Sequence, residues 1–167
     1  MTSPGTSLWA FSLERYGRPG VAAICLQLQD EAGADVNMVL ACLWCAQRGV
    51  ALDRNDMAAF AAGDVAKWHD RVVRPLRAAR RAMKGALPGL SVDAVEVLRS
   101  RLKTVELETE RFEQILLEAE LVQRPPTAVL AGDPAGAALA NLLLYAETLQ
   151  GRAQPDVLQQ LASACID

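Results

Sequence analysis

Residues 91–123 carry the pattern that most constrains the fold, because apolar side chains recur there at alternating spacings of three and four residues. This alternation is typical of one face of an α-helix, whereas a β-strand repeats every second residue. The seam runs over about three and a half heptads, and Thr109 is its one polar position. Its members are Val95, Leu98, Leu102, Val105, Thr109, Phe112, Leu116 and Ala119. We predict a long helix over 91–123 that packs this seam on other helices or on a second copy of the chain.

The rest of the chain also favours helix. Apolar residues make up 51% of it, alanine and leucine dominate, and glycine or proline separates the periodic stretches. Ser7, Asp35 and either Asp53 or Asn55 stand where helix N-caps are expected. The helix over 36–48 is apolar nearly all round, which indicates a central position. We predict one all-α domain over 1–167, a bundle of about six to eight helices. It divides into an N-terminal lobe (7–84), a linker (85–90), and the long helix with the C-terminal helices (91–165).

A basic strip follows Gly63. Residues 64–84 contain seven cationic and two acidic side chains, although the whole chain has a net charge of −3. On a helical wheel the cations share one face, and Pro75 is expected to kink or split the helix. We predict an anion- or partner-binding face formed by Lys67, Arg71, Arg74, Arg77, Arg81 and Lys84.

Two kinds of partner fit this face. The acidic residues of the long helix, from Glu106 to Glu120, provide an internal one. An external one is an acidic protein, an acidic lipid surface or a nucleic acid. Nucleic acid is less favoured, because no aromatic side chain on that face is placed to stack on bases.

A polar and aromatic group in the first third predicts a small pocket, formed by Trp9, Tyr16, Asp35, Asn37 and Trp44. Asp35 has a structural role as N-cap, whereas Asn37 has none so clear. Buried tryptophan and tyrosine side chains need polar partners, which a pocket of this kind supplies.

Residues that carry chemistry are scarce. The single histidine, His69, lies among polar and basic neighbours and is expected at the surface. Cys42 and Cys45 form a C-x-x-C pair inside a predicted helix, where the helix dipole does not activate a thiol, so we predict buried structural cysteines. We therefore expect no catalytic residue, metal site or cofactor, and an enzyme is the less favoured class.

The opening third resembles a proteobacterial family of conserved hypothetical proteins. The resemblance rests on Leu8, Trp9 and Phe11; on Tyr16, Pro19, Gly20 and Val21; on 26–29; and on Gly33, Asp35, Val36, Asn37 and Trp44. It continues in the basic strip and around 106–114. The family has no assigned activity, so the resemblance supports the fold and points to Asp35, Asn37 and the arginines as residues of interest.

The longest apolar run, 38–46, is far shorter than the roughly 20 residues of a membrane span. The N-terminus lacks a secretory signal, and four cysteines without one indicate reduced thiols in the cytoplasm. We predict a cytoplasmic, non-enzymatic interaction or regulatory protein that docks an acidic partner through 67–84. A homodimer formed through 91–123 is a separate hypothesis. The alternative is a small-molecule-binding or catalytic helical protein.

Overall fold

The computed structural model describes residues 6–85, 88–122, 133–150 and 152–166. Its elements are α1 (Leu8–Tyr16), α2 (Val21–Ala32), α3 (Val36–Gln47), α4 (Arg54–Ala62), α5 (Asp64–Trp68), the π-helical turn η1 (His69–Val73), α6 (Arg74–Ala82), α7 (Val92–Val122), α8 (Pro134–Thr148) and α9 (Pro155–Cys165). If α5, η1 and α6 are counted as one continuous helix, the described ranges contain eight helices and no strand. The predicted all-α class is confirmed.

Helix α3 lies at the centre of the core, as its sequence predicts. Ten of its twelve residues are buried, and α1, α2, α7 and α8 all pack against it. Helix α8 buries three small residues, Ala137, Ala138 and Ala146, beside the larger Leu142 and Tyr145, which allows a close approach to α3. The hydrophobic core draws on residues of α1 to α5 and of α7 to α9, on both sides of the expected 85–90 linker, so the chain forms a single-domain bundle.

The turn between α2 and α3 places Asp35. Gly33 ends α2 in a left-handed conformation (φ +70°), which glycine adopts without steric cost. Two residues later the Asp35 side chain accepts a hydrogen bond from the Asn37 backbone N–H at 2.9 Å, which caps α3 as predicted. The capping role therefore holds the Asp35 carboxylate at one end of the central helix.

The basic strip forms a single helical path with a π turn in its middle. Pro75 lacks the N–H that an α-helix would donate to the Arg71 carbonyl, and its ring crowds that carbonyl. The turn just before it widens, so that the Arg74 N–H bonds the His69 carbonyl in η1. The helix is thus disrupted near Pro75, as expected. The disruption is a π turn over His69–Val73, just before the proline. One extra residue in a turn rotates the side chains that follow it by about 100° about the helix axis. The π turn therefore changes the direction of the α6 side chains relative to that of His69.

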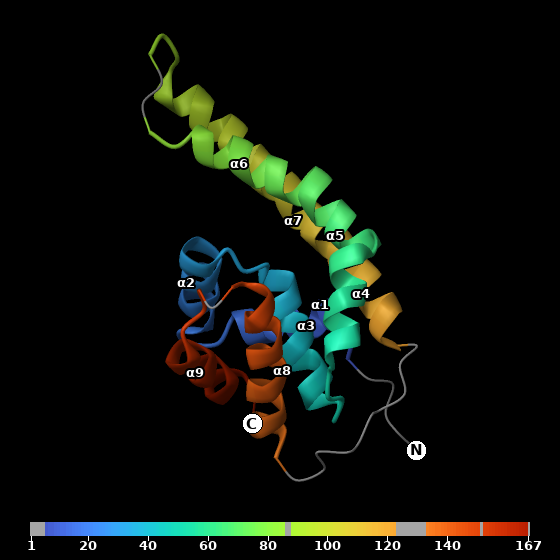
Figure 1. Cartoon of the computed structure of the whole chain (residues 1–167). Coiled ribbons are helices and arrows are strands. Elements are labelled where there is room, and N and C mark those ends of the chain that lie inside the picture. The colour runs from blue at the N-terminus through green and yellow to red at the C-terminus, as the bar shows by residue number, and fades with distance from the viewer. Residues whose placement is uncertain (1–5, 86–87, 123–132, 151, 167) are drawn as a thin grey trace.

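Helices α6 and α7 run antiparallel and extend as an arm beyond the rest of the bundle (Figure 1). At the other end of α7, Leu117 and Leu121 enter the core. No residue of α6 is buried. The arm is therefore held mainly by contacts between its own two helices.

The long helix packs with a different face from the predicted one. Its buried residues are Glu106, Thr109, Glu113, Gln114, Leu117 and Leu121. Only Thr109 belongs to the predicted seam. Leu98, Val105 and Phe112 of that seam are exposed. The polar face turns inward because ion pairs and hydrogen bonds from α3, η1 and α6 satisfy it.

Three sequence expectations fall on positions outside the described residues. The sequence predicts that Pro125-Pro126 stops the long helix, that Gly151 ends the helix after it, and that the linker includes 86–87.

Candidate functional site

Three ionisable side chains from distant parts of the chain meet beside the core. Asp35 comes from the N-cap of α3, His69 from η1 and Glu113 from the middle of α7. The His69 Nδ1 atom lies 2.9 Å from Glu113 Oε1 and 3.3 Å from Asp35 Oδ2. One potential ligand atom from each residue lies within 4.8 Å of the other two. We call these three residues the His-carboxylate cluster.

A second layer of hydrogen bonds fixes the cluster. The Asn37 Nδ2 donates to Glu113 Oε2 at 2.6 Å, and Gln114 Nε2 donates to Asn37 Oδ1 at 2.9 Å. The Asp35 backbone N–H donates to the Tyr145 hydroxyl at 2.9 Å. Glu113 is fully buried, so its two carboxylate oxygens depend on these protein donors. This explains Asn37, for which the sequence offered no clear role.

Burial and mutual charge change the proton affinity of the cluster. Burial, followed by the negative charge of Glu113, raises the pKa of Asp35 above its ordinary range. Burial disfavours the imidazolium of His69, but the hydrogen bond to Glu113 and the charge of Asp35 outweigh it and raise the pKa of His69. Groups that share protons in this way are typical of functional sites as well as structural networks.

A cleft of about 620 Å³ opens onto Asp35 and His69. Arg74, Arg77 and Arg81 of α6 also line it, and Tyr145 and Arg152 contribute from α8 and the residues that follow. A smaller pocket of about 140 Å³ adjoins these residues and is mostly apolar, with Met38, Met57 and Phe60 among its walls. Asp35, His69 and Tyr145 line both spaces and so stand between a polar cleft and an apolar pocket.

Much of the predicted cationic face is engaged within the chain. Arg77 donates to Glu106 at 3.1 Å and to Glu110 at 2.5 Å, and Arg80 pairs with Glu106. The internal partner considered from the sequence is therefore present for Arg77. Lys67, Arg74 and Arg81 pair with acidic residues near the surface, namely Asp64, Asp70 and Asp30.

The five predicted pocket residues do not converge. Asp35 and Asn37 join the cluster region, whereas Trp44 is buried and donates its indole N–H to the Thr6 carbonyl at 2.8 Å. Trp9 lies under the Arg111 guanidinium, and Tyr16 is partly exposed at the end of α1. Of the five, Asp35 lines both spaces described above.

The expectation that His69 lies at the surface is wrong. Its side chain is only 16% exposed, because η1 turns it toward α3 and α7. The local sequence does not predict this burial, since Lys67, Asp70 and Arg71 are charged and only Trp68 beside them is apolar. The detectable signal is in α7, where Glu106, Thr109, Glu113 and Gln114 follow helical spacing on one polar face.

The cysteines behave as the sequence predicts. Cys25, Cys42, Cys45 and Cys165 are buried free thiols. Burial raises the pKa of Cys25 to about 12, which keeps it protonated and unreactive at neutral pH.

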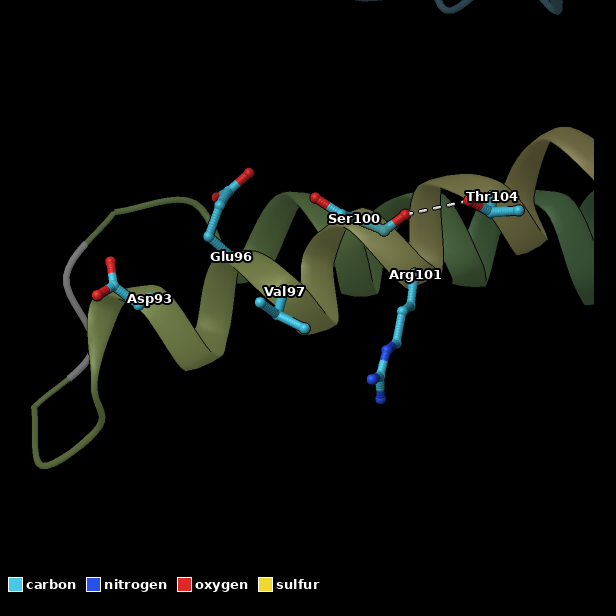
Figure 2. Close-up of a pocket in the computed structure, with 6 residues that line it drawn as sticks. All are labelled: Asp93, Glu96, Val97, Ser100, Arg101 and Thr104. Atoms are coloured by element: carbon cyan, nitrogen blue, oxygen red, sulfur yellow. Dashed lines mark hydrogen bonds between the residues drawn. The ribbon is translucent and has the colours of Figure 1, made fainter.

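A further depression lies on the outer part of α7. Figure 2 shows its residues, which include Glu96, Val97 and Arg101, projecting from a single helix. The only hydrogen bond drawn between them joins the Thr104 hydroxyl to the Ser100 carbonyl within that helix. Side chains from one helix without an opposing wall do not enclose a ligand, so this surface is not a candidate site.

In a comparison with known families, residues 7–117 match the model of a protein of unknown function (DUF2390). The chain belongs to this family. The part that matches the DUF2390 model contains all three residues of the His-carboxylate cluster, whereas Tyr145 lies beyond it. No curated protein and no solved structure matches the chain. None of the helices in the described ranges has the length and apolar character needed to cross a membrane.

Proposed function

We propose that the protein binds a small anionic ligand in the cleft beside the His-carboxylate cluster. One observation carries this proposal: Arg74, Arg77 and Arg81, expected from the sequence to bind an anion, line the same cleft as Asp35 and His69. The proposal thereby joins two separate sequence hypotheses, an anion-binding basic face and a small-molecule pocket that includes Asp35.

Two of these arginines are available to a ligand. The partners of Arg74 and Arg81 are Asp70 and Asp30, whose side chains are more than half exposed. Exposed ion pairs of this kind contribute only about 0–1 kcal/mol, so a ligand can replace them at little cost. Arginine suits the role because its planar guanidinium binds carboxylate and phosphate groups through paired hydrogen bonds.

The dimensions of the cleft support a small molecule. A volume of about 620 Å³ falls within the range of ligand-binding clefts, roughly 300–1,000 Å³. Arg152 adds a fourth arginine to the lining. Phosphate- and carboxylate-bearing metabolites fit this lining.

A thermal-shift screen of phosphorylated and carboxylated metabolites tests the proposal. We expect a subset to raise the melting temperature of the wild-type protein, and the double variant Arg74→Glu/Arg81→Glu to lose most of that shift. Lys67→Glu and Arg71→Glu are matched controls, because both positions lie on the basic strip but do not line the cleft. Equal loss in the controls would reject a cleft-bound ligand.

A second candidate function, docking of an acidic protein, is favoured by the outward cations of the strip. Arg71 and Lys84 are exposed, and no ion pair with either is found among the described residues. The same variants separate the two functions. Docking predicts that Lys67→Glu and Arg71→Glu weaken the complex as much as Arg74→Glu, measured by co-purification with and without nuclease.

Self-association through α7 is a separate proposal. It is supported by the exposed apolar side chains of that helix, among them Leu98, Val105 and Phe112, which recur every seven residues as in helix-helix interfaces. We expect sedimentation to show a dimer at high concentration, and Leu98→Lys/Val105→Lys to be monomeric. Ser100→Lys, on the same helix, should leave the dimer intact. A monomeric wild-type protein at every concentration would contradict this.

We also infer a reducing bacterial cytoplasm as the setting. The four buried free thiols support it, since none of them needs oxidation for the fold. We infer as well that the family is proteobacterial and that its opening motif, from Leu8 to Trp44, is characteristic of it.

A further inference from the structure

The His-carboxylate cluster has dimensions that suit a bound metal ion. Around a metal ion with ligands at about 2.0–2.2 Å, neighbouring ligand atoms lie about 2.8–3.1 Å apart in octahedral coordination and about 3.3–3.6 Å apart in tetrahedral coordination. The two distances from His69 Nδ1, 2.9 Å to Glu113 Oε1 and 3.3 Å to Asp35 Oδ2, are close to this spacing. The carboxylate oxygens of Asp35 and Glu113 lie within 4.8 Å of each other, so all three side chains lie near enough to share one cation.

The charges of the cluster favour a bound cation, because two carboxylates lie close together. Asp35 and Glu113 place two carboxylates next to each other, one of them fully buried. Among the described residues, His69 is the one basic side chain found in direct contact with both. Without a metal, shared protons must hold the group together. A divalent ion with two carboxylates and a neutral imidazole gives a net charge of zero, which removes the repulsion without any proton.

The surroundings resemble the supporting layer of a metal site. Asn37 holds the outer oxygen of Glu113, which leaves Oε1 directed at His69, and Gln114 in turn holds Asn37. Tyr145 anchors the backbone of Asp35. Outer contacts of this kind orient ligands and raise metal affinity.

His69 enters the cluster from a π turn. Turns of this type are uncommon and occur often at functional sites. Because Asp35 and His69 line the cleft, an ion held by them would be reached from the cleft.

We propose that Asp35, His69 and Glu113 bind one divalent first-row transition-metal ion through Asp35 Oδ2, His69 Nδ1 and Glu113 Oε1. One imidazole nitrogen with two carboxylate oxygens suits Mn²⁺, Fe²⁺ or Zn²⁺, whereas an all-oxygen set would suit Mg²⁺ or Ca²⁺. This site goes beyond the proposed anionic ligand. Metal binding is measurable without that ligand, so the two proposals can fail separately.

Calorimetric titration of tag-free, chelator-treated protein with Zn²⁺, Mn²⁺ and Mg²⁺ tests the site. We expect one Zn²⁺ or Mn²⁺ per chain and weaker binding of Mg²⁺. Asp35→Asn and Glu113→Gln should each lower the Zn²⁺ affinity at least about 100-fold, since each removes a charged ligand. Asp70→Asn is the matched control, because Asp70 lines the same cleft and follows His69 directly but lies outside the cluster. Equal Zn²⁺ affinity in all four proteins would overturn the proposal.

A second measurement does not depend on the variants folding. His69 is the only histidine of the chain, so its ring nitrogens give a single, self-assigned pair of ¹⁵N resonances. Addition of Zn²⁺ to the wild-type protein should shift the Nδ1 resonance far more than the Nε2 resonance. Unchanged imidazole resonances at saturating Zn²⁺ would show that the cluster binds protons only, and would overturn the proposal.

The anion proposal is then tested on the same samples. Arg74→Glu/Arg81→Glu should retain Zn²⁺ binding, because neither arginine belongs to the cluster. If that variant binds Zn²⁺ but no anion, both proposals stand. If it also lost Zn²⁺ binding while folded, the three residues alone would not make the site, and the metal proposal would be overturned.

Discussion

Replacing Asn141 by leucine should lower the free energy of unfolding by about 2–5 kcal/mol. Asn141 is buried in α8 and serves three backbone groups: its Oδ1 accepts from the Leu52 N–H at 2.9 Å, and its Nδ2 donates to the Cys42 and Val50 carbonyls at 3.1 Å. Leucine has a similar shape but offers no hydrogen bond. Each buried backbone group left without its partner costs about 1–3 kcal/mol. Urea unfolding followed by circular dichroism measures the loss.

The control for this prediction is Gln159→Leu on α9. Gln159 is an exposed amide whose side-chain hydrogen bond, to Ser163, lies at the surface. The same amide-to-leucine exchange should there change stability by no more than about 0.5 kcal/mol. Similar effects at both positions would mean that Asn141 does not tie α8 to the segment between α3 and α4.

Glu106→Gln should destabilise the protein by about 3–5 kcal/mol at neutral pH, because it leaves Arg77 and Arg80 without their shared carboxylate in a largely buried place. Burial opposes the charge of Glu106, but hydrogen bonds from Arg80 and Arg77 outweigh it and lower its pKa below the ordinary 4.5. The stabilisation is therefore complete above pH 4.5 and is lost as pH falls through the lowered pKa. The difference in unfolding free energy between wild type and Glu106→Gln should narrow over that acidic range.

Glu108→Gln is the matched control for the acidic range. Glu108 is exposed on the same helix, so its replacement should change stability by no more than about 0.5 kcal/mol at any pH. A wild-type-minus-Glu106→Gln difference that stays constant from pH 7 to the acid limit would contradict the role given to this ion pair.

Local signals in the sequence account for most of the helices. Ser7 and Asp35 cap helices as predicted, Asp53 rather than Asn55 caps the fourth helix, and Gly33 ends the second. These outcomes follow from the sequence because capping depends on residues within a few positions of each other. The central position of α3 followed from its uniform apolarity. These features do not depend on which segments meet in the folded chain.

The packing of α7 and the site were harder to predict because they depend on long-range pairing. The apolar seam through Leu98 and Val105 looks like the buried face by hydrophobicity, yet the face with Glu106 and Glu113 turns inward. Burial of this polar face is favourable only if Arg77, His69 and Asn37 pair with its carboxylates. These partners lie 29 to 76 residues away in the sequence. A single sequence does not show which distant residues pair, so it predicts a surface position for His69.

The division of α7 between the arm and the core implies that one helix has two local stabilities. Near Leu117 its amides open only when the whole bundle unfolds, because side chains from several helices cover them. Toward Val92 the helix is supported chiefly by α6, so its amides exchange through small local openings. Glu113 lies between these regimes. The cluster is thus built where a rigid core meets a segment that can fray, and a ligand bound there would tie the two together.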